Sequence, residues 1–226
     1  MFSRAVAPNV IPDASSLTAA LAGIGMNLTS SSKLRQEPNI EDTLIFASAE
    51  GMEKSELRVL ALLVTWFGVH FPWVNADRLT RLVLAHPSTR IRALWSALAR
   101  WKRSDRRFTR LARAYKGQRI DLVGTGSDFL IRRGGEDPRF EKTPLRVARN
   151  VLRDRAHDVL PPRQLAVHHH AYRYRVLIGP SYRADMWAAL DREPTVSAAE
   201  LARRTYGSFA TAWHVKRDFG LLQLNP

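Results

Sequence analysis

The sequence predicts a mainly α-helical protein with small β-hairpins, folded as two domains that each contain three helices. Apolar side chains recur with helical spacing in three successive segments of the first half, and short β-branched segments follow them around a glycine turn. In the second half, a serine-capped helix is followed closely by another helix, which is the arrangement of a helix-turn-helix. These observations define the expected fold.

Changes in composition divide the chain into four predicted segments. Residues 1–40 are rich in Ser, Ala, Pro and Asn and show little periodicity, so we expect a mobile N-terminal arm. Residues 41–133 form a central basic domain. Residues 134–144 contain two glycines and two prolines and are predicted to be a linker. Residues 145–226 form a C-terminal helical domain.

The central domain is predicted to begin with three helices. Glu53–Phe67 has apolar side chains at i, i+3 and i+4, and Gly68 ends this helix. Asn75 is placed to cap a second helix, which stops before Pro87 because proline lacks the N–H that a helix needs. Ser88 caps the third helix, whose apolar face consists of Ile91, Leu94, Trp95, Leu98 and Trp101.

Strand signals follow these helices. Phe108–Tyr115 alternates imperfectly between apolar and polar residues, and Arg119–Val123 is short and β-branched. Gly124–Gly126 has the composition of a turn, and Phe129–Arg132 is placed to pair back as the second strand of a hairpin. Three helices followed by a hairpin is the order of a winged helix, so we expect the central domain to be winged-helix-like.

The C-terminal domain is also predicted to be helical. Residues 145–160 form one predicted helix, which two prolines end, and residues 164–178 form a second, less clearly periodic one. Tyr182–Leu190 precedes the helix-turn-helix, which gives three helices again. The residues after Phe219 are long enough for one strand, so this domain is expected to be winged-helix-like without a full wing.

Local capping signals define the helix-turn-helix. Ser197 and Glu200 have the spacing of a capping box, which predicts a helix start at Ser197. Gly207 breaks that helix, and Ser208 offers a hydroxyl to cap the next one. The second helix runs to Phe219. Its expected inward side chains are Ala212, Val215 and Phe219, and its expected outward ones are Ala210, His214 and Arg217.

This segment resembles the winged-helix domains of bacterial transcriptional regulators. The likeness consists of an entry helix at Arg183–Leu190, a Ser-x-x-Glu-Leu-Ala helix at Ser197–Arg204, and a recognition helix at Ser208–Phe219 before Gly-Leu. It implies DNA binding. The N-terminal half, from residues 39–44 through residues 74–83, is similar in style to regulators encoded beside nucleotidyltransferase-like toxins in bacteria, which implies an antitoxin or autorepressor role.

The chain carries a large excess of positive charge. Its formal net charge is +14, and 29 of the 35 basic residues are arginine, whose guanidinium forms two parallel hydrogen bonds with phosphate. Residues 81–119, the basic segment, hold twelve basic residues and one acidic residue, Asp105. Solvated surfaces usually mix both signs, so we expect this segment to contact nucleic-acid phosphates. An acidic protein partner is the alternative.

The candidate DNA-binding residues come from both parts of the chain. Arginines of the third central helix and of the segment after it would neutralise phosphates. Residues in the N-terminal turns of the recognition helix would reach base edges, and the two arginines before it suit the DNA backbone. The full set is Arg90, Arg92, Arg100, Lys102, Arg103, Arg106, Arg107, Arg110, Arg203, Arg204, Ser208, Thr211, His214 and Arg217.

Sequence signals for catalysis or metal binding are few. The chain has no cysteine, which excludes disulfides, thiolate metal sites and cysteine nucleophiles and fits a reducing cytoplasm. His168–His170 is a histidine cluster, but adjacent helical side chains point about 100° apart. Gly124–Asp128 lacks the following Asp-x-Asp pair with which a nucleotidyltransferase holds magnesium. We therefore expect no enzyme activity, no cofactor and no metal.

These observations predict a cytoplasmic, sequence-specific DNA-binding transcriptional regulator, a repressor or autorepressor of a bacterial operon. Duplex DNA is the expected partner, and a homodimer on a palindromic site is the expected assembly. An antitoxin or adaptor that binds a protein such as a cognate toxin through its basic face is one alternative, and an RNA-binding protein is another. The apolar stretch Leu17–Met26 is too short to span a bilayer, so no membrane association is expected.

Overall fold

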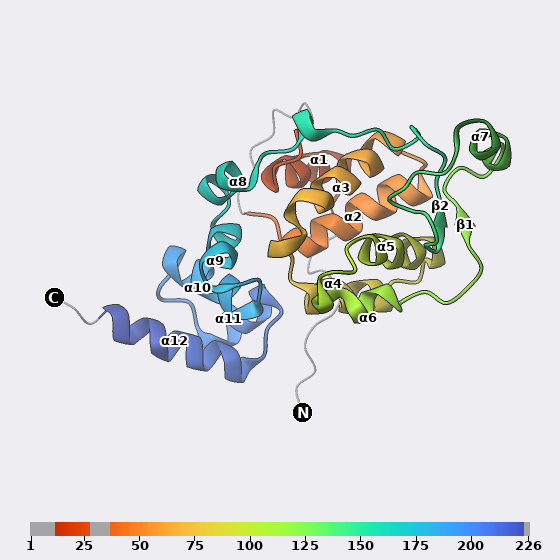
Figure 1. Cartoon of the computed structure of the whole chain (residues 1–226). Helices are drawn as coiled ribbons and strands as arrows, with labels where there is room; N and C mark the ends of the chain where they lie inside the picture. The colour runs from red at the N-terminus through yellow and green to blue at the C-terminus, as the bar shows by residue number, and fades with distance from the viewer. Residues whose placement is uncertain (1–11, 28–36, 224–226) are drawn as a thin grey trace.

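The computed structural model describes residues 12–27 and 37–223. These residues form twelve α-helices, three 3-10 helices and two short strands, so the predicted mainly helical fold is confirmed (Figure 1). No helix in the described ranges combines the length and the apolar composition needed to cross a bilayer.

One large apolar core lies among the helices from α1 to α9 and includes the segments that connect them. We call this part of the molecule, residues 12–27 and 37–178, the body. Its helices are α1 (Ala14–Gly23), α2 (Ile40–Glu53), α3 (Leu57–His70), α4 (Ala76–Ala85), α5 (Thr89–Trp101), α6 (Thr109–Ala112), α7 (Ser127–Gly134), α8 (Pro162–His168) and α9 (His170–Ile178). Short 3-10 turns occur at Phe71–Trp73, Arg106–Phe108 and Ala156–Asp158.

Helix α5 is a core helix of the body. All of its side chains from Ala93 to Ala99 are buried. The Trp95 indole N–H donates to the Ser48 hydroxyl of α2 at 2.8 Å, and the Ser96 hydroxyl donates to the Ala112 carbonyl of α6 at 2.7 Å. Because other helices cover α5 on most sides, it has no long free face along which a duplex could lie.

The three helices predicted in the central segment are present as α3, α4 and α5. Asn75 Oδ1 accepts the backbone N–H of Arg78 at 3.1 Å, and Ser88 Oγ accepts that of Ile91 at 3.5 Å, so both predicted caps are confirmed. The first of the three helices begins only at Leu57, because Glu53 is the last residue of α2.

The predicted β-hairpin is wrong. Residues 129–132 lie in α7, and β1 (Ile120–Asp121) pairs in parallel with β2 (Leu145–Arg146). Gly126 has a φ of +85° and directly precedes α7, so the glycine turn starts a helix instead of reversing a strand. The wing expected at this place is therefore a helix.

The strand predicted at residues 108–115 is also wrong. Phe108 and Leu111 are both buried, at a spacing of three residues that suits a helix and not a strand. They lie on the second 3-10 turn and on α6. Apolar and polar residues alternate imperfectly in this segment because its buried residues follow the spacing of a helix.

Segments that we expected outside the core contribute to it. In α1, Leu17 and Leu21 are buried in the large apolar core, so residues 14–23 are not a mobile arm. The rest of the predicted arm includes residues 1–11 and 28–36, which lie outside the described residues. The predicted linker, residues 134–144, contains Phe140, which is fully buried in the same core.

Residues 145–160, predicted to be a helix, are mostly irregular. The backbone carbonyl of Arg146 accepts the N–H of Leu122, and that of Val147 accepts the N–H of Asp137. Because these carbonyls bond across the chain, they are not available to a local helix. The apolar side chains of this segment are buried in the large core without forming a helix, as Leu145, Val147 and Leu152 show.

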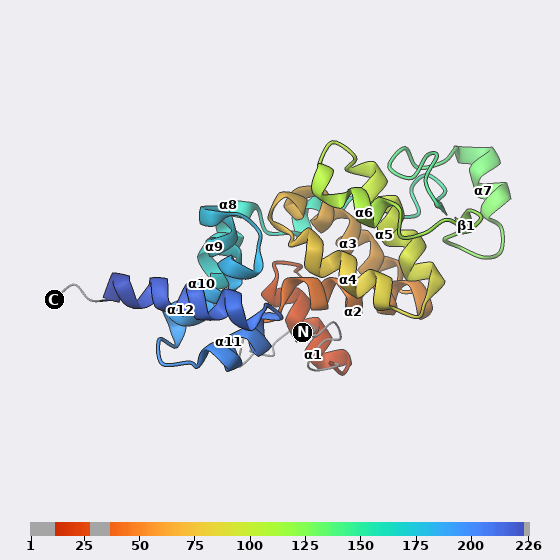
Figure 2. The ribbon, with the colours of Figure 1, turned by 90° about the horizontal axis from the view of Figure 1, so that it is seen from below.

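The last three helices form a smaller unit with an apolar cluster of its own. We call residues 182–223 the C-terminal unit; it contains α10 (Tyr182–Arg192), α11 (Ala198–Thr205) and α12 (Phe209–Gln223). Helix α12 begins beside α11 and runs away from the body, and it continues past Phe219 without a strand as far as Gln223 (Figure 1 and Figure 2). The buried cluster consists of Met186, Leu190, Val196, Leu201, Ala202, Ala212, Val215 and Phe219.

Candidate nucleic-acid interface

The turn between α11 and α12 is built as the sequence predicts. Ser197 Oγ accepts the backbone N–H of Glu200 at 3.2 Å and caps α11. Ser208 Oγ accepts the N–H of Thr211 at 3.1 Å and caps α12, and the two hydroxyls lie 2.7 Å apart. Tyr206 ends α11 in the left-handed conformation with a φ of 57°. Ser208 and Thr211 therefore both hold the start of α12.

Helix α12 has one buried side and one exposed side. Ala212, Val215 and Phe219 are buried in the cluster of the C-terminal unit, as predicted. The exposed side carries Ala210, Trp213, His214 and Arg217, and Phe209 stands exposed at its start. The Arg217 guanidinium pairs with Asp218 at 2.8 Å. No described element covers this exposed side, so it is accessible to a partner.

The two arginines at the end of α11 are paired with acids. Arg203 and Arg204 both bond Glu200, each with a shortest contact of 2.6 Å, and Arg204 also reaches Glu193 at 2.5 Å. Hydrogen bonds from Arg203 and Arg204 lower the pKa of Glu200 to about 2. A phosphate at this position would therefore have to compete with a carboxylate for both guanidinium groups.

The arginines of α5 donate hydrogen bonds to backbone carbonyls of neighbouring segments. Arg90 donates to the Leu122 carbonyl at 3.0 Å, Arg92 to the Pro87 carbonyl at 3.2 Å and Arg100 to the Ala112 carbonyl at 3.2 Å. Arg90 and Arg92 are only partly exposed. Arg90 and Arg92 are therefore less accessible to a ligand than the exposed arginines further along the basic segment.

The residues after α5 carry most of the accessible charge of the basic segment. Arg103, Arg106 and Arg110 are exposed, and their side chains form no hydrogen bond or ion pair with another described residue. Arg107 is held by Asp105 at 2.6 Å and by the Pro72 carbonyl at 2.9 Å. These four side chains stand on and around the short α6.

Part of the basic segment adjoins the C-terminal unit. Arg107 and Arg110 line a hollow of about 420 Å³ together with residues 180–182 at the start of α10. A Cβ placed on Gly207, in the turn before α12, would lie 3.5 Å from the Tyr182 Cβ. Tyr182 thus lines the hollow and also lies beside the turn before α12, so Arg107 and Arg110 stand on the side of the body that meets the C-terminal unit.

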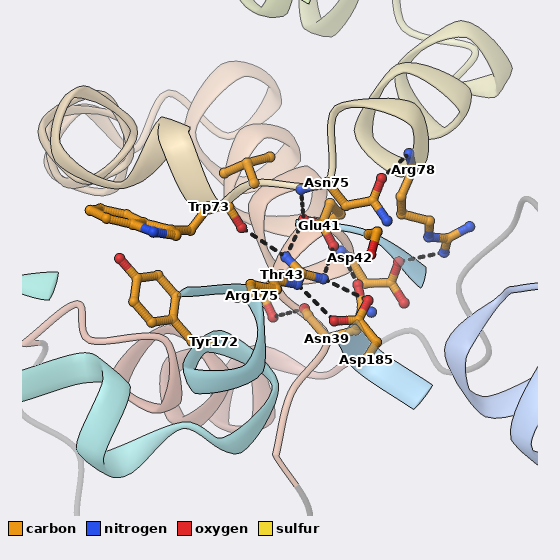
Figure 3. A network of polar contacts seen from close by, with 12 residues as sticks. Asn39, Glu41, Asp42, Thr43, Trp73, Asn75, Arg78, Tyr172, Arg175 and Asp185 are labelled. Carbon is orange, nitrogen blue, oxygen red and sulfur yellow. Dashed lines mark hydrogen bonds and ion pairs between the residues drawn. The ribbon is translucent and has the colours of Figure 1, made fainter. Parts of the chain in front are cut away.

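A buried ionic network attaches the C-terminal unit to the body (Figure 3). The Arg175 guanidinium of α9 binds Glu41 of α2 at 2.6 and 2.9 Å and Asp185 of α10 at 2.7 and 2.9 Å. Burial opposes the charge of Arg175, but the two carboxylates outweigh it and raise the pKa of its guanidinium. Glu41 also accepts the backbone N–H of Asn75 at 2.8 Å.

A second part of this network reaches the helix-turn-helix itself. Asp42 accepts a hydrogen bond from Arg78 at 2.5 Å and another from the Tyr206 hydroxyl at 2.6 Å. The Arg78 guanidinium lies 3.5 Å from the centre of the Tyr206 ring. Because Tyr206 stands in the turn before α12, the network holds that turn against α2 and α4.

The residues of this network could not be predicted from the sequence. Glu41, Asp42, Arg175 and Asp185 have no motif or spacing in common, and the bond between Glu41 and Arg175 spans 134 residues of chain. Their only local signal is an acid in the first turn of α2 and of α10, which is typical of helix starts in general.

The histidine cluster is divided among different tasks. The buried His169 accepts the backbone N–H of Tyr172 at 3.2 Å and caps α9, His170 pairs with Asp191 at 2.9 Å, and His168 is exposed. Within residues 12–27 and 37–223, no three His, Asp or Glu side chains are placed to hold one metal ion.

Comparison of the chain with models of known protein families, with curated proteins and with solved structures gave no match.

Proposed function

We propose that this protein is a transcriptional regulator that binds duplex DNA, with α12 as the recognition helix in the major groove. The observation that carries the proposal is the uncovered side of α12, which follows a capped turn and is held in one orientation by buried ionic contacts. A helix that reads base edges has to be both exposed and fixed.

The side chains of α12 suit this role. His214 and Arg217 are exposed on adjacent turns and can donate hydrogen bonds to base acceptors in the major groove. The Arg217 pair with Asp218 is exposed, so its net stabilisation is small and a base acceptor can replace it. Thr211 and Ser208 would contribute mainly by keeping the start of the helix ordered.

The arginines around α6 would supply the electrostatic part of the affinity. Arg106 and Arg110 form no side-chain hydrogen bond or ion pair with described residues, and the hollow at Arg107 and Arg110 adjoins the start of α10. We expect the protein to act as a homodimer on a two-fold symmetric site, as regulators of this type usually do.

The test is a fluorescence anisotropy titration of the full chain with a labelled duplex from upstream of its own coding region, with a scrambled duplex as competitor. His214→Ala with Arg217→Gln should reduce the preference for the first duplex by about thirtyfold or more, because each of the two base contacts contributes about 1–3 kcal/mol of discrimination. Arg106→Gln with Arg110→Gln should lower the affinity for both duplexes by the same factor. Arg133→Gln with Arg163→Gln, which removes two exposed charges on α7 and α8, is the matched control.

Salt dependence is the second readout of this experiment. If about six arginines contact phosphate, the logarithm of the binding constant should fall with the logarithm of the salt concentration at a slope near −5. Equal affinity for both duplexes would contradict base recognition by α12. Affinity that does not change with salt would contradict the phosphate contacts.

A protein partner is the second candidate, because the exposed side of α12 also carries large apolar side chains. Phe209 is 54% exposed and Trp213 is 50% exposed, and aromatic residues of this kind often anchor protein interfaces. In that case Trp213→Ala would weaken binding of the partner, such as a cognate toxin, and would leave the salt-dependent affinity for DNA unchanged.

A further inference from the structure

The body contains a continuous groove that is separate from α12. It consists of two hollows of about 620 and 630 Å³ that share Trp101, Pro138 and Arg139. One wall comes from the ends of α3 and α5 and from α6, and the other wall comes from residues 137–156. The second wall includes parts of the predicted linker, residues 134–144, and of the predicted helix, residues 145–160.

The lining of this groove is strongly basic. Eight basic and four acidic side chains line the two hollows. Two of the acids are already neutralised by arginines, since Asp105 binds Arg107 at 2.6 Å and Asp137 binds Arg139 at 2.5 Å. The groove therefore presents an excess of positive charge that the protein itself does not compensate.

Five of the basic side chains have no partner among the described residues, and both walls contribute to them. Arg103 and Arg113 stand on the helical wall, and Lys142, Arg149 and Arg153 stand on the opposite wall. All five are exposed. Unpaired cations on both sides of a concave surface suit an extended polyanion that lies between the walls.

An aromatic side chain lies where the two hollows meet. Trp101 lines both of them, and the Lys102 ammonium lies 3.9 Å from the centre of its ring. Partial burial lowers the pKa of Lys102. An aromatic ring inside a basic groove is the combination with which proteins bind single-stranded nucleic acid, because bases stack on the ring while cations follow the backbone.

We propose that this groove binds a single strand of nucleic acid, with phosphates along both walls and a base against Trp101. A duplex presents its bases stacked and paired inside, so it offers nothing for Trp101 to stack on, whereas an unpaired base does. Each hollow has the size of an ordinary small-ligand pocket, so together they accommodate a few nucleotides. This site is distinct from the duplex site proposed on α12 and does not depend on it.

The test is an anisotropy titration of the full chain with labelled ten-nucleotide oligo(U) and oligo(dT), with unlabelled oligo(dT) and an unlabelled ten-base-pair duplex as competitors. We expect excess unlabelled oligo(dT) to displace the labelled single strands, and the unlabelled duplex to displace them far less. Arg103→Gln with Arg149→Gln removes one cation from each wall and should weaken single-strand binding by about tenfold and reduce the salt slope by about 1.4. The matched control is Arg133→Gln with Arg163→Gln, two exposed arginines outside the groove, which should change affinity less than about twofold.

A fluorescence measurement tests the role of Trp101. Oligo(dT) should quench part of the tryptophan emission of the wild-type chain, and Trp101→Phe should remove that part while circular dichroism shows an unchanged fold. The proposal is overturned if both double variants weaken single-strand binding equally, or if the unlabelled duplex displaces labelled oligo(dT) as well as unlabelled oligo(dT) does. His214→Ala in α12 should leave single-strand binding unchanged, so that a failure of this proposal is distinguished from a failure of the duplex proposal.

Discussion

At the residue scale, His70 is a buried histidine that the fold keeps uncharged. Its Nδ1 lies 2.7 Å from the Tyr172 hydroxyl, and its Nε2 lies 2.9 Å from the Leu160 carbonyl. Because a carbonyl can only accept, Nε2 carries the proton and Nδ1 accepts from the tyrosine, which describes a neutral ring. Burial lowers the pKa of His70 from 6.5 to about 4.

This pKa shift predicts a loss of stability in acid. Between pH 6.5 and pH 4 the unfolded chain binds a proton at His70 that the folded chain does not, so the free energy of unfolding falls as the pH falls. The contribution of His70 is full above pH 6.5 and about 3 kcal/mol smaller below pH 4. Urea unfolding at several pH values should show this slope in the wild type and a flatter one in His70→Gln.

The exposed His157 supplies the matched control for that experiment. His157→Gln should retain the wild-type slope, because it leaves His70 and both of its hydrogen-bond partners in place. Parallel loss of stability in the wild type and in His70→Gln would contradict the assignment. None of this is visible in the sequence, since the Tyr172 hydroxyl that faces His70 lies 102 residues further along the chain.

At the element scale, α12 depends on its cap. Ser208→Ala removes the oxygen that accepts the Thr211 N–H, and such a change usually costs about 1 kcal/mol. Amide hydrogen exchange at Thr211 should become faster, while exchange in α2 and α3 stays unchanged. Ser104→Ala, at an exposed serine outside any helix start, should leave exchange unchanged. Protection at Thr211 that survives Ser208→Ala would show that the turn is held by packing alone.

The caps and the apolar periodicity are the features of the elements that the sequence could predict. Asn75, Ser88, Ser197 and Ser208 all cap helices as expected, because each cap involves residues only three positions apart. The predicted hairpin fails for a related reason. A glycine turn is compatible with a strand reversal and with a helix start, and the choice is made by the parallel pairing of β1 with β2 far along the chain.

At the scale of the whole molecule, the Arg175 network couples the C-terminal unit to the body. Arg175→Met would leave the carboxylates of Glu41 and Asp185 buried without a counter-charge, and breaking a buried pair in this way costs about 3–5 kcal/mol. Urea unfolding should show this loss, and limited proteolysis should cut faster at residues 176–183. Arg173→Met, at an exposed neighbour on α9, is the control.

A decrease of less than about 1 kcal/mol in the free energy of unfolding of Arg175→Met would contradict this coupling, because exposed ion pairs contribute that little.

The whole molecule is also the scale at which prediction from the sequence fails. The helical class followed from periodicity, but the extent of the body did not. Phe140 and Leu17 lie in segments of loop-like composition, and only contacts with distant helices bury them.

The spacing of the central ion pair also affects how the chain folds as it is made. Glu41 precedes Arg175 by 134 residues. Because a ribosome adds roughly 5–20 residues per second, Arg175 is synthesised about 7–27 seconds after Glu41. Until then α2 cannot bury Glu41 at low cost and has to keep that end hydrated. The start of α2 therefore cannot pack fully until α9 has been synthesised. We expect a chain truncated before Arg175 to keep the start of α2 exposed to solvent and to be a target for proteases.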